Sequence, residues 1–515
     1  MRKIIYLLTK TLEPMANLEP MANSRRQRHS LVYLLASVAG PGAMVGESVG
    51  NSVLIEGLAV NLESCAELES QLRDAIARGE DIELCSLPTS EVLQFFVDAG
   101  LGGSPSAQQL RKSSETHTPC HRHRGFLAVA YSGAGDLVRS TSEISEPFRL
   151  ELYRGDRIRL IFGGSAADEP RLVEAYAARR LWAQRLGFSS VGEINSAIIS
   201  GGRAKTLVQL AEALHDHQVT SIASQITGVL GGAEAAGGSK RLILIAGPSS
   251  SGKTTFAKRL SVALETLGSR PVVVSVDSYY RHWQEIDPRG MQHVDWESLQ
   301  SLNLDLLNEH LLALLAGNEV LVPEYDMKTS APMSKEHWQP MRLPPGGVVI
   351  MEGIHCLNPA LTPRVPAADK FQIMISPLSG TRVDNLHVVS STQLRMVRRM
   401  VRDFLFRGRS ALSTLRQWPG VALGEVRNIY PHQNNADTVM NSGLCYELNV
   451  LRAYAEPLLH TITPDLPEYG EARRLLAMLS VHSTMPSTLV PPQSLLREFI
   501  GGSWFYDYAG LFQNA

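Results

Sequence analysis

The stretch that decides the fold is residues 241–281, RLILIAGPSSSGKTTFAKRLSVALETLGSRPVVVSVDSYYR. Its apolar run Leu242–Ala246 predicts a buried strand, and Thr255–Thr266 predicts a helix. Between them, GPSSSGKT at residues 247–254 fits the pattern G-x-x-x-x-G-K-[S/T]. The order of strand, glycine-rich loop and helix is the context in which this pattern binds phosphate. The alternative interpretation is a glycine- and serine-rich surface loop.

Each part of this loop has a physical role in binding a nucleoside triphosphate. Gly247 and Gly252 permit turns that point backbone N–H groups at phosphate oxygens, and the following helix adds its positive N-terminal end. Lys253 can reach the β- and γ-phosphates, and the Thr254 hydroxyl can bind Mg²⁺. We therefore expect ATP and Mg²⁺ as cofactors. The predicted nucleotide-binding residues of the loop are Gly247, Pro248, Ser249, Ser250, Ser251, Gly252, Lys253, Thr254 and Thr255.

The composition of the chain is that of an ordinary globular protein. Its 515 residues are 44% apolar and 19% charged, and this length suggests about three domains. The formal net charge of −2 gives no reason to expect a nucleic acid or an anionic membrane as partner. Five scattered cysteines without a CxxC pair favour a reducing compartment, which we take to be the cytoplasm. No apolar stretch approaches the ~20 residues of a membrane helix.

Residues 1–28 are predicted to be a disordered leader. They contain six basic and two acidic residues, and the hexapeptide LEPMAN occurs twice, at residues 12–17 and 18–23. Each copy contains a proline, which interrupts helices. The alternative is an organelle transit peptide, because such peptides are basic and poor in acidic residues.

Residues 29–168 are expected to form an α+β domain. Periodicity predicts helices at residues 30–38, 65–78 and 89–98 and a strand at residues 52–62. The segment FRLELYRGDRIRLIF, residues 148–162, alternates apolar and polar side chains around a central turn and predicts a β-hairpin. Residues 100–118 are rich in Gly, Ser, Pro and charge and are predicted to be a loop.

Potential metal ligands lie at the end of that loop. His117, Cys120, His121 and His123 fall within seven residues and could bind zinc. Structural zinc sites, however, usually pair ligands from two separated segments. Neighbouring histidines in a polar loop are more often solvated, so we favour that interpretation over a zinc site.

Residues 169–238 are predicted to be a helical connector that ends in a flexible linker. Two apolar stripes at helical spacing lie within it, and Ser190 with Glu193 forms a capping-box pattern. The run GGAEAAGGS at residues 231–239 is typical of a flexible linker. We therefore predict a boundary near residue 238, followed by a P-loop domain at residues 239–480 and a C-terminal extension at residues 481–515.

A second strand is predicted at residues 271–276, PVVVSV, and leads directly into Asp277. We expect this strand beside the P-loop strand, so that the carboxylate faces the phosphate crevice. There Asp277 could accept the proton of an attacking hydroxyl, as phosphoryl transfer requires. The alternative is an aspartate that caps a helix.

A third strand is predicted at Val348–Met351 and ends in Glu352. An acidic residue at the tip of an apolar strand is like a Walker B motif and can hold Mg²⁺ directly or through water. A solvent-exposed strand end is the alternative. The predicted metal ligands are therefore Thr254 and Glu352.

Four arginines are predicted to share one face of a helix in LRMVRRMVRDFLFRGR, residues 394–409. The spacing i, i+3, i+4, i+7 is that of Arg395, Arg398, Arg399 and Arg402, with Arg407 and Arg409 just beyond. Such a cluster could be a lid that neutralises charge in the transition state of phosphoryl transfer. The alternatives are a nucleic-acid patch and a solvated basic face.

In their order along the chain, these motifs resemble the uridine kinase/phosphoribulokinase family of P-loop kinases. The matching segments are AGPSSSGKTTFAKRL, VDSYYR, LNLDLLNEHLLALLAGNEVLVPEYDMKT, MEGIHCLNPALT, RRMVRDFLFRG, YELNVLRAYAEPLL and LLREFIGGS. The first is generic to P-loop kinases, whereas the whole series in this order is specific. The resemblance is strongest to the long bacterial form, which has a threonyl-tRNA-synthetase-like N-terminal region. FRLELYRGDRIRLIF belongs to that part.

The resemblance implies an α/β fold in which helices flank a parallel P-loop sheet, after an α+β domain. It also implies an ATP-dependent kinase that phosphorylates the 5′-hydroxyl of uridine or cytidine in pyrimidine salvage. The catalytic residues would be Asp277 as base, Lys253, Arg399 and Arg402, and Arg407 would also bind the nucleotide. The substrate-binding residues would be Asp277, Tyr280, Asp295 as acceptor of a ribose hydroxyl, Tyr325 and Asp326.

The chain departs from the long family near the substrate-binding segments. Val388 and Gln393 stand where the family pattern N-R-I-x-T-T-D-x-R-L has an arginine and an aspartate. After Asp326, the basic pattern K-T-G-K-R becomes KTSAP, residues 328–332. These changes bear on nucleoside choice more than on phosphoryl transfer.

Two alternatives to a nucleoside kinase are kept. One is a kinase of another small hydroxyl substrate, such as a sugar phosphate. The other is a regulatory or RNA-associated protein that only binds ATP. For the N-terminal half we expect a scaffold or oligomerisation role, so a homo-oligomer is a candidate assembly. The expected partner is a small-molecule nucleoside, without nucleic acid or membrane.

Overall fold

A computed structural model describes residues 18–49, 51–113, 115–130, 137–163, 169–199, 202–228, 240–290, 293–327 and 329–505. The chain divides into two compact units. The first comprises Met1–Ser200, Ser379–Ser390 and Gly470–Ser483, and the second comprises Gly201–Leu378, Ser391–Tyr469 and Thr484–Ala515. Within the described ranges, no helix is long and apolar enough to cross a membrane.

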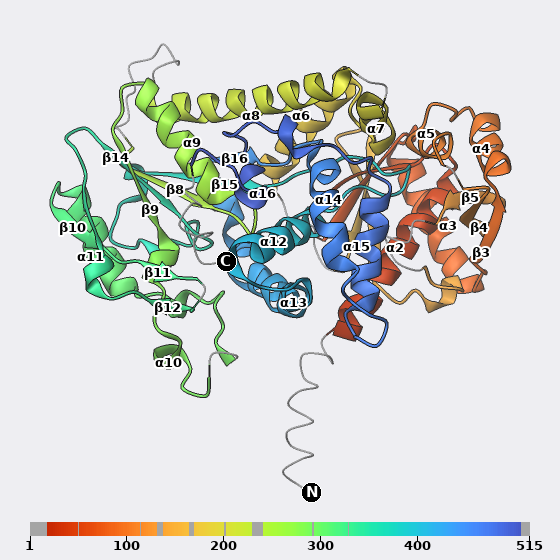
Figure 1. Cartoon of the computed structure of the whole chain (residues 1–515). Helices are drawn as coiled ribbons and strands as arrows, with labels where there is room; N and C mark the ends of the chain where they lie inside the picture. Colours follow the sequence, from red (N-terminus) through yellow and green to blue (C-terminus); the bar gives the residue numbers. More distant parts are fainter. Residues whose placement is uncertain are drawn as a thin grey trace, which may run out of the picture. The chain divides into compact units, whose positions relative to one another are not determined.

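The second unit is built on a five-stranded parallel sheet (Figure 1). The strand order is β16-β15-β8-β14-β9, and every neighbouring pair is parallel. The strands are β8 (Leu242–Ala246), β9 (Pro271–Ser275), β14 (Val348–Glu352), β15 (Lys370–Ser376) and β16 (Thr438–Asn441). All five residues of β8 are buried, as expected of a parallel strand covered on both faces. The predicted α/β fold with a parallel P-loop sheet is confirmed.

Helices cover both faces of this sheet (Figure 1). Leu244 of β8 belongs to the same apolar cluster as Leu307 and Leu311 of α11. Side chains alternate along a strand, so Ile243 and Ile245 point to the opposite face, where α9 packs against β8, β9 and β14. The helices of the unit include α8 (Arg203–Thr227), α9 (Lys253–Thr266), α10 (Trp283–Ile286), α11 (Leu304–Leu315), α12 (Ser391–Arg407), α13 (Ala411–Asn428), α14 (Glu447–Leu459) and α16 (Arg497–Ile500). Two antiparallel pairs accompany the sheet: β10 (Glu319–Val322) with β13 (Gln339–Arg342), and β11 (Tyr325–Asp326) with β12 (Ala331–Pro332).

The strand that leads to Asp277 does not lie beside the P-loop strand. β14 separates β8 from β9, so that part of the prediction was wrong. Glu352 is in register with Ile245 of β8 and with Ser275 of β9. Because parallel strands end at one edge, the P-loop, Glu352 and Asp277 still meet at the carboxyl edge of the sheet, with Glu352 in the middle.

The first unit contains two antiparallel sheets with helices, as predicted for an α+β module. One sheet has the order β1 (Met44–Val49), β2 (Ser52–Glu56), β7 (Arg157–Phe162), β6 (Phe148–Tyr153), and the other β3 (Glu83–Pro88), β4 (His117–His123), β5 (Phe126–Val129). The helices include α2 (Leu18–Ala39), α3 (Leu62–Arg78), α4 (Thr89–Asp98), α5 (Pro105–Leu110), α6 (Pro170–Leu186), α7 (Val191–Ile199) and α15 (Tyr469–Ser480). The hairpin at residues 148–162 is confirmed, whereas α5 lies in the predicted loop at residues 100–118.

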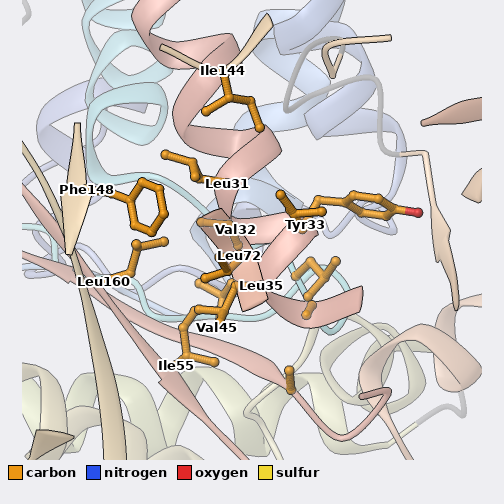
Figure 2. Packing of buried hydrophobic residues seen from close by; sticks show 14 of the residues in the cluster. Leu31, Val32, Tyr33, Leu35, Val45, Ile55, Leu72, Ile144, Phe148 and Leu160 are labelled. Carbon is orange, nitrogen blue, oxygen red and sulfur yellow. The ribbon is translucent and has the colours of Figure 1, made fainter. Parts of the chain in front are cut away.

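The core of the first unit lies between α2, α3 and the larger sheet (Figure 2). Leu31 and Leu35 of α2 and Leu72 of α3 are fully buried and belong to one cluster with Phe148 and Leu160 of the sheet. Burying a side chain of this size contributes about 1.5–3 kcal/mol relative to leaving it exposed. The cluster therefore fixes both helices on the sheet.

The N-terminal helix begins earlier than predicted. α2 starts at Leu18, so residues 18–28 of the supposed disordered leader are helical. Residues 1–17 lie outside the described residues. Pro20 falls in the first turn of α2, where its missing N–H would have no helical partner in any case, and so it does not interrupt the helix.

The compact units also divide the chain differently from the predicted domains. α8, expected in the connector at residues 169–238, belongs to the second unit. Conversely, residues 379–390 and 470–483 belong to the first unit although they were placed with the P-loop domain or beyond it. The predicted linker at residues 231–239 lies outside the described residues.

The potential zinc ligands lie on strand β4 rather than in a loop. Cys120 is fully buried, and His123 is hydrogen-bonded to Ser37 and to Glu80 at 2.8 Å each. Among the described residues, no group of three or more His, Cys, Asp or Glu side chains is arranged to hold a metal ion. Cys120 and His123 are therefore buried within the fold, so the prediction of solvated side chains was wrong for these two.

Candidate functional site

The loop at residues 247–252 turns tightly between β8 and α9. Gly252 has a φ of 91° and Ser250 a φ of 60°, both in the left-handed region. At Gly247 an added Cβ would clash with the backbone oxygen of Ile375 in β15. Glycine at this position is thus required by the close approach of the loop to β15.

The loop leaves unpaired polar atoms inside it. The hydroxyls of Ser250 and Ser251 are buried, and within the described part of the chain they have no hydrogen-bond partner. Lys253 Nζ lies over the loop and donates to the carbonyl oxygens of Gly247 at 3.0 Å and Pro248 at 3.3 Å. Since buried unpaired hydroxyls are costly, these residues fit a phosphate group whose oxygens would pair with them. They do not fit an ordinary surface loop.

Glu352 is buried at the end of β14, so the alternative of an exposed strand end was wrong. Only 3% of the residue is exposed, and Oε1 accepts hydrogen bonds from the hydroxyls of Thr254 at 3.2 Å and Ser275 at 2.9 Å. Burial and the charge of Asp277 raise the pKa of Glu352 to about 7, although Lys253 opposes the shift. The contact between Thr254 and Glu352 places two oxygen donors together, which fits Mg²⁺.

Asp277 lies in the 3₁₀ turn Val276–Tyr279, directly after β9. Ser275, rather than Asp277, occupies the N-cap position of this turn. The carboxylate is half-buried, and no hydrogen bond or ion pair to it is found among the described residues. The turn follows Ser275, which is hydrogen-bonded to Glu352, and it packs against β11, which carries Tyr325. The charge of Asp277 contributes to the raised pKa of both Glu352 and Tyr325.

Three aromatic rings lie together near Asp277. The ring centroids of Tyr280, Trp296 and Tyr325 are 5.5 to 6.4 Å apart, and Tyr280 Oη donates to the Trp296 carbonyl oxygen at 3.1 Å. The Tyr325 hydroxyl is buried and, in the described ranges, has no hydrogen-bond partner. Aromatic faces of this kind stack with bases, typically for about 1–3 kcal/mol per base. The sequence analysis did not single out Trp296, although it directly follows Asp295 in the chain.

Glu297, which the sequence analysis did not single out, is more buried than Asp295, two positions earlier. Its Oε2 atom is buried and lacks a hydrogen-bond partner in the part of the chain described. Burial raises the pKa of Glu297 to about 7, against the opposing charges of Arg399 and Lys253. Asp295, in contrast, is exposed, and its Oδ1 accepts a hydrogen bond from the Glu297 backbone at 3.1 Å.

Replacing Glu297 by Gln should remove a pH-dependent cost to stability. The folded-state pKa of about 7 exceeds the ordinary value of 4.5, so the folded protein keeps a proton that the unfolded chain loses. Stability therefore falls as pH rises from about 4.5 to 7. We expect Glu297→Gln, which mimics the protonated form, to gain on the order of 2 kcal/mol at pH 8 and little at pH 5. Thermal unfolding at both pH values measures this.

The matched control is Asp295→Asn, because Asp295 is exposed two positions away. It should change stability by less than about 0.5 kcal/mol at either pH. An equal stability change for Glu297→Gln at pH 5 and pH 8 would contradict the buried, protonated carboxyl.

Two of the four helix arginines hold the P-loop rather than facing solvent. Arg395 and Arg398 are 1% and 0% exposed and form ion pairs with Glu425 and Glu447, respectively. They also donate to the backbone oxygens of residues 249–250, at 3.2 and 3.3 Å. The solvated basic face and the nucleic-acid patch are both wrong for these two side chains.

The other two, Arg399 and Arg402, surround the fully buried carboxylate of Asp403 together with Arg407 at the end of the helix. Arg399, Arg402 and Arg407 approach it to 3.3, 3.6 and 3.2 Å. Burial alone would raise the pKa of Asp403, but the three guanidiniums outweigh it and lower the pKa below its ordinary value. The charge of Arg402, followed by burial, lowers the pKa of Arg407 to about 10. The three arginines carry more positive charge than Asp403 can balance. Arg399 also donates to Ser249 Oγ at 2.8 Å, so this positive cluster lies next to the P-loop.

The other positions noted in the sequence have local roles. Asp326 follows Tyr325 in β11 and accepts a hydrogen bond from the Thr329 hydroxyl at 2.8 Å. Val388 packs against the apolar core of the first unit, and Gln393 lies in the first turn of α12. Lys328 lies outside the described residues.

The comparisons with known proteins fall on the unit that carries this site. The sequence profile of the Phosphoribulokinase / Uridine kinase family matches residues 242–449. A uridine kinase of Deinococcus deserti is 30% identical over 178 residues, which are 34% of this chain and 75% of the relative. A uridine kinase of Chloroflexus aurantiacus is 29% identical over 209 residues, 39% of this chain and 87% of the relative.

A solved structure is also similar over this part of the chain. It is a possible uridine kinase from Bacillus stearothermophilus, with 17% sequence identity and a TM-score of 0.28. The similarity covers 44% of this chain and 100% of that one. The predicted likeness of the N-terminal region to threonyl-tRNA synthetase stays a prediction, because the family match begins at residue 242.

Proposed function

The chain belongs to the phosphoribulokinase/uridine kinase family, and we propose that it transfers the γ-phosphate of ATP to the 5′-hydroxyl of uridine or cytidine. The observation that carries the proposal is the position of Asp277. Asp277 lies in the turn that follows Ser275, a hydrogen-bond partner of Glu352, and this turn packs against β11, which carries Tyr325. A hydroxyl held there could lose its proton to Asp277 while it attacks the phosphate.

Nucleotide binding in this proposal rests on the P-loop and on the residues next to it. Lys253 and the loop N–H groups hold the phosphate oxygens, and Thr254 with Glu352 would hold Mg²⁺. When bound, Mg²⁺ supplies positive charge that offsets the charge of the phosphates. Arg399 and Arg402 would stabilise the charge that develops during transfer.

Acceptor binding rests on the aromatic rings and on one buried carboxyl. Tyr280, Trp296 and Tyr325 offer faces on which a pyrimidine can stack, and Glu297 has an unpaired oxygen that can accept a ribose hydroxyl. Positioning the hydroxyl against the phosphate is the main catalytic contribution expected of such a site. The uridine kinases among the relatives support this choice of acceptor.

A cytoplasmic location is part of the proposal and is supported by the five cysteines, which are all free thiols. A homo-oligomer formed through the first unit stays a prediction from the sequence.

An ATP-consumption screen tests the proposed function. Uridine, cytidine, purine nucleosides, sugars and sugar phosphates are offered in parallel to the wild-type protein and to Asp277→Asn. We expect uridine or cytidine to stimulate ATP use by the wild type to about 10²–10⁴ times the rate of the variant, the usual contribution of a general base. Stimulation by a phosphorylated sugar alone would establish the sugar kinase instead, and ATP binding without turnover would favour the regulatory alternative.

A further inference from the structure

We propose that Glu498 of the C-terminal segment is a positioning residue for phosphoryl transfer and acts through Thr255 and Arg402. This inference rests on the proposed function. It concerns residues 494–505, which the sequence analysis treated as an extension beyond the P-loop domain. In the structure this segment instead packs against the P-loop and the start of α9.

The segment packs directly on the P-loop and its helix. An added Cβ on Gly252 would lie 2.6 Å from Leu495 Cδ2, so the Leu495 side chain closes one side of the loop. Farther along, the Phe505 carbonyl oxygen accepts a hydrogen bond from Lys258 of α9 at 2.6 Å. The two contacts hold residues 494–505 against the N-terminal half of α9.

The first half of the segment is also tied to a different helix. Ser494 Oγ donates to Glu212 of α8 at 2.6 Å, and the same carboxylate accepts a hydrogen bond from Tyr446, which directly precedes α14. All three side chains are buried. The position of α16, which begins three residues after Ser494, is therefore fixed by buried contacts within the second unit.

Glu498 of α16 joins the P-loop helix to the arginine helix. Its Oε2 atom accepts hydrogen bonds from Thr255 Oγ1 at 2.7 Å and from the Thr255 backbone N–H at 3.4 Å, and its Oε1 atom lies 3.6 Å from Arg402 Nη1. The carboxylate is buried, with 7% of the residue exposed. Thr255 is the third residue of α9 and so lies in the first turn, where a backbone N–H has no carbonyl four residues earlier within the helix. Glu498 therefore caps the P-loop helix from a distant part of the chain.

The same carboxylate supplies charge that the arginine cluster needs. Among the described residues, Arg402 forms ion pairs with Asp403 and Glu498. If Glu498 were removed, Asp403 would be the one acidic partner left to Arg402 in that part of the chain. The neighbouring ring of Phe499 lies 5.0 Å from the guanidinium of Arg398 and 5.9 Å from that of Arg402. α16 thus holds the Arg402 side chain by an ion pair and a cation–π contact, both of which restrict its orientation.

Thr255 was predicted to bind the nucleotide, but it is fully buried and its hydroxyl donates to Glu498. The alternative interpretation of this contact is that Glu498 competes with a phosphate group for the Thr255 hydroxyl. Positioning and competition predict opposite effects of Glu498 on nucleotide affinity, and so one set of measurements separates them.

The test variant is Glu498→Gln, which keeps an acceptor for Thr255 and removes the charge that faces Arg402. We expect kcat to fall about tenfold while the KM for the nucleoside stays unchanged. We also expect the Kd of Mg·ATP to rise about fivefold and that of Mg·ADP by less than twofold, because Arg402 is assigned to the transferred phosphate. Fluorescence titration with both nucleotides measures this ratio without turnover.

Two further variants show whether Glu498 acts through Arg402. If it does, the double variant Glu498→Gln/Arg402→Met should be no slower than Arg402→Met alone, since coupled residues are not additive. Glu265→Gln removes one charge from the exposed end of α9 and serves as the control, with unchanged kinetics and nucleotide binding. If Glu498→Gln folds poorly, Arg402→Lys leaves the cap intact and should change the ATP-to-ADP affinity ratio in the same direction.

The outcomes are distinct. Tighter binding of Mg·ATP by Glu498→Gln would overturn positioning in favour of competition, and additive losses in the double variant would also overturn it. A lowered melting temperature with unchanged kcat and affinity ratio would leave Glu498 only a structural role and reject the proposal. If no nucleoside is phosphorylated but the affinity ratio changes as expected, the proposed acceptor is wrong and the positioning role stands.

Discussion

Asp277→Asn is expected to lower kcat by about 10²–10⁴-fold while the KM for ATP changes little. The substitution preserves the size of the side chain but removes the group that would accept the hydroxyl proton. No partner of the Asp277 carboxylate is found among the described residues, so its loss should leave the fold intact. Steady-state kinetics with saturating nucleoside, together with thermal unfolding, measures both effects.

The control for this prediction is Asp295→Asn. Asp295 is exposed and its carboxylate contacts the backbone of Glu297, so, in contrast to the ribose-binding role that the family resemblance implies, we expect kcat to stay within about threefold of the wild type. A loss of less than tenfold in Asp277→Asn would assign proton transfer to another group, with Glu297 the next candidate. An equal loss in both aspartate variants would point to a disturbed loop rather than to a missing base.

Arg398→Met is expected to destabilise the protein by about 3–5 kcal/mol, since it leaves the buried Glu447 carboxylate without its partner. The pair is bidentate, with distances of 2.6 and 2.9 Å, and Arg398 also donates to backbone oxygens at Ser250 and Ser442. We expect the affinity for ATP to fall as well, because the P-loop backbone loses one of its anchors. Urea unfolding gives the stability change.

A surface ion pair provides the comparison for Arg398. Arg416 pairs with Glu468 at 2.9 Å, but 54% of the Arg416 side chain is exposed. Arg416→Met should therefore cost less than about 1 kcal/mol. The double variant Arg398→Met/Glu447→Leu should recover part of the loss, since no charge is left buried alone. Equal effects of Arg398→Met and Arg416→Met would contradict the structural role of the buried pair.

Local sequence patterns predicted most of the elements that build the candidate site. The limits of β8 were predicted from its apolar run, and those of α4 from its periodicity, because both patterns lie within one short segment. The β-hairpin at residues 148–162 and the cap at Ser190 and Glu193 were confirmed for the same reason. In each case the stabilising partners are neighbours in the sequence.

Contacts between distant segments were the ones that the sequence could not reveal. The position of β14 between β8 and β9 depends on crossover connections, which strand patterns do not specify. The arginine helix was predicted, but the role of Arg398 depends on Glu447, 49 positions away. Likewise, the acidic neighbours Asp295 and Glu297 differ in burial only through the packing of the turn that contains them.

The C-terminal segment illustrates the same limit. LLREFIGGS was quoted as a family motif, yet nothing within the motif indicates that Glu498 would contact Thr255, 243 positions earlier. Glu498 is assigned to the phosphate site by its contacts with the distant residues Thr255 and Arg402, and not by a local sequence pattern. Signals of this kind are found only when the packing is known.

Transfer of labelled γ-phosphate from ATP to uridine, compared with 5′-deoxyuridine, tests the proposed reaction most directly. The two compounds share the base and the ribose 2′- and 3′-hydroxyls. They differ only in the 5′-hydroxyl, which is the proposed phosphate acceptor. We predict labelled uridine 5′-monophosphate from uridine and no labelled product from 5′-deoxyuridine. Labelled product from 5′-deoxyuridine, or none from uridine or cytidine, would contradict the account.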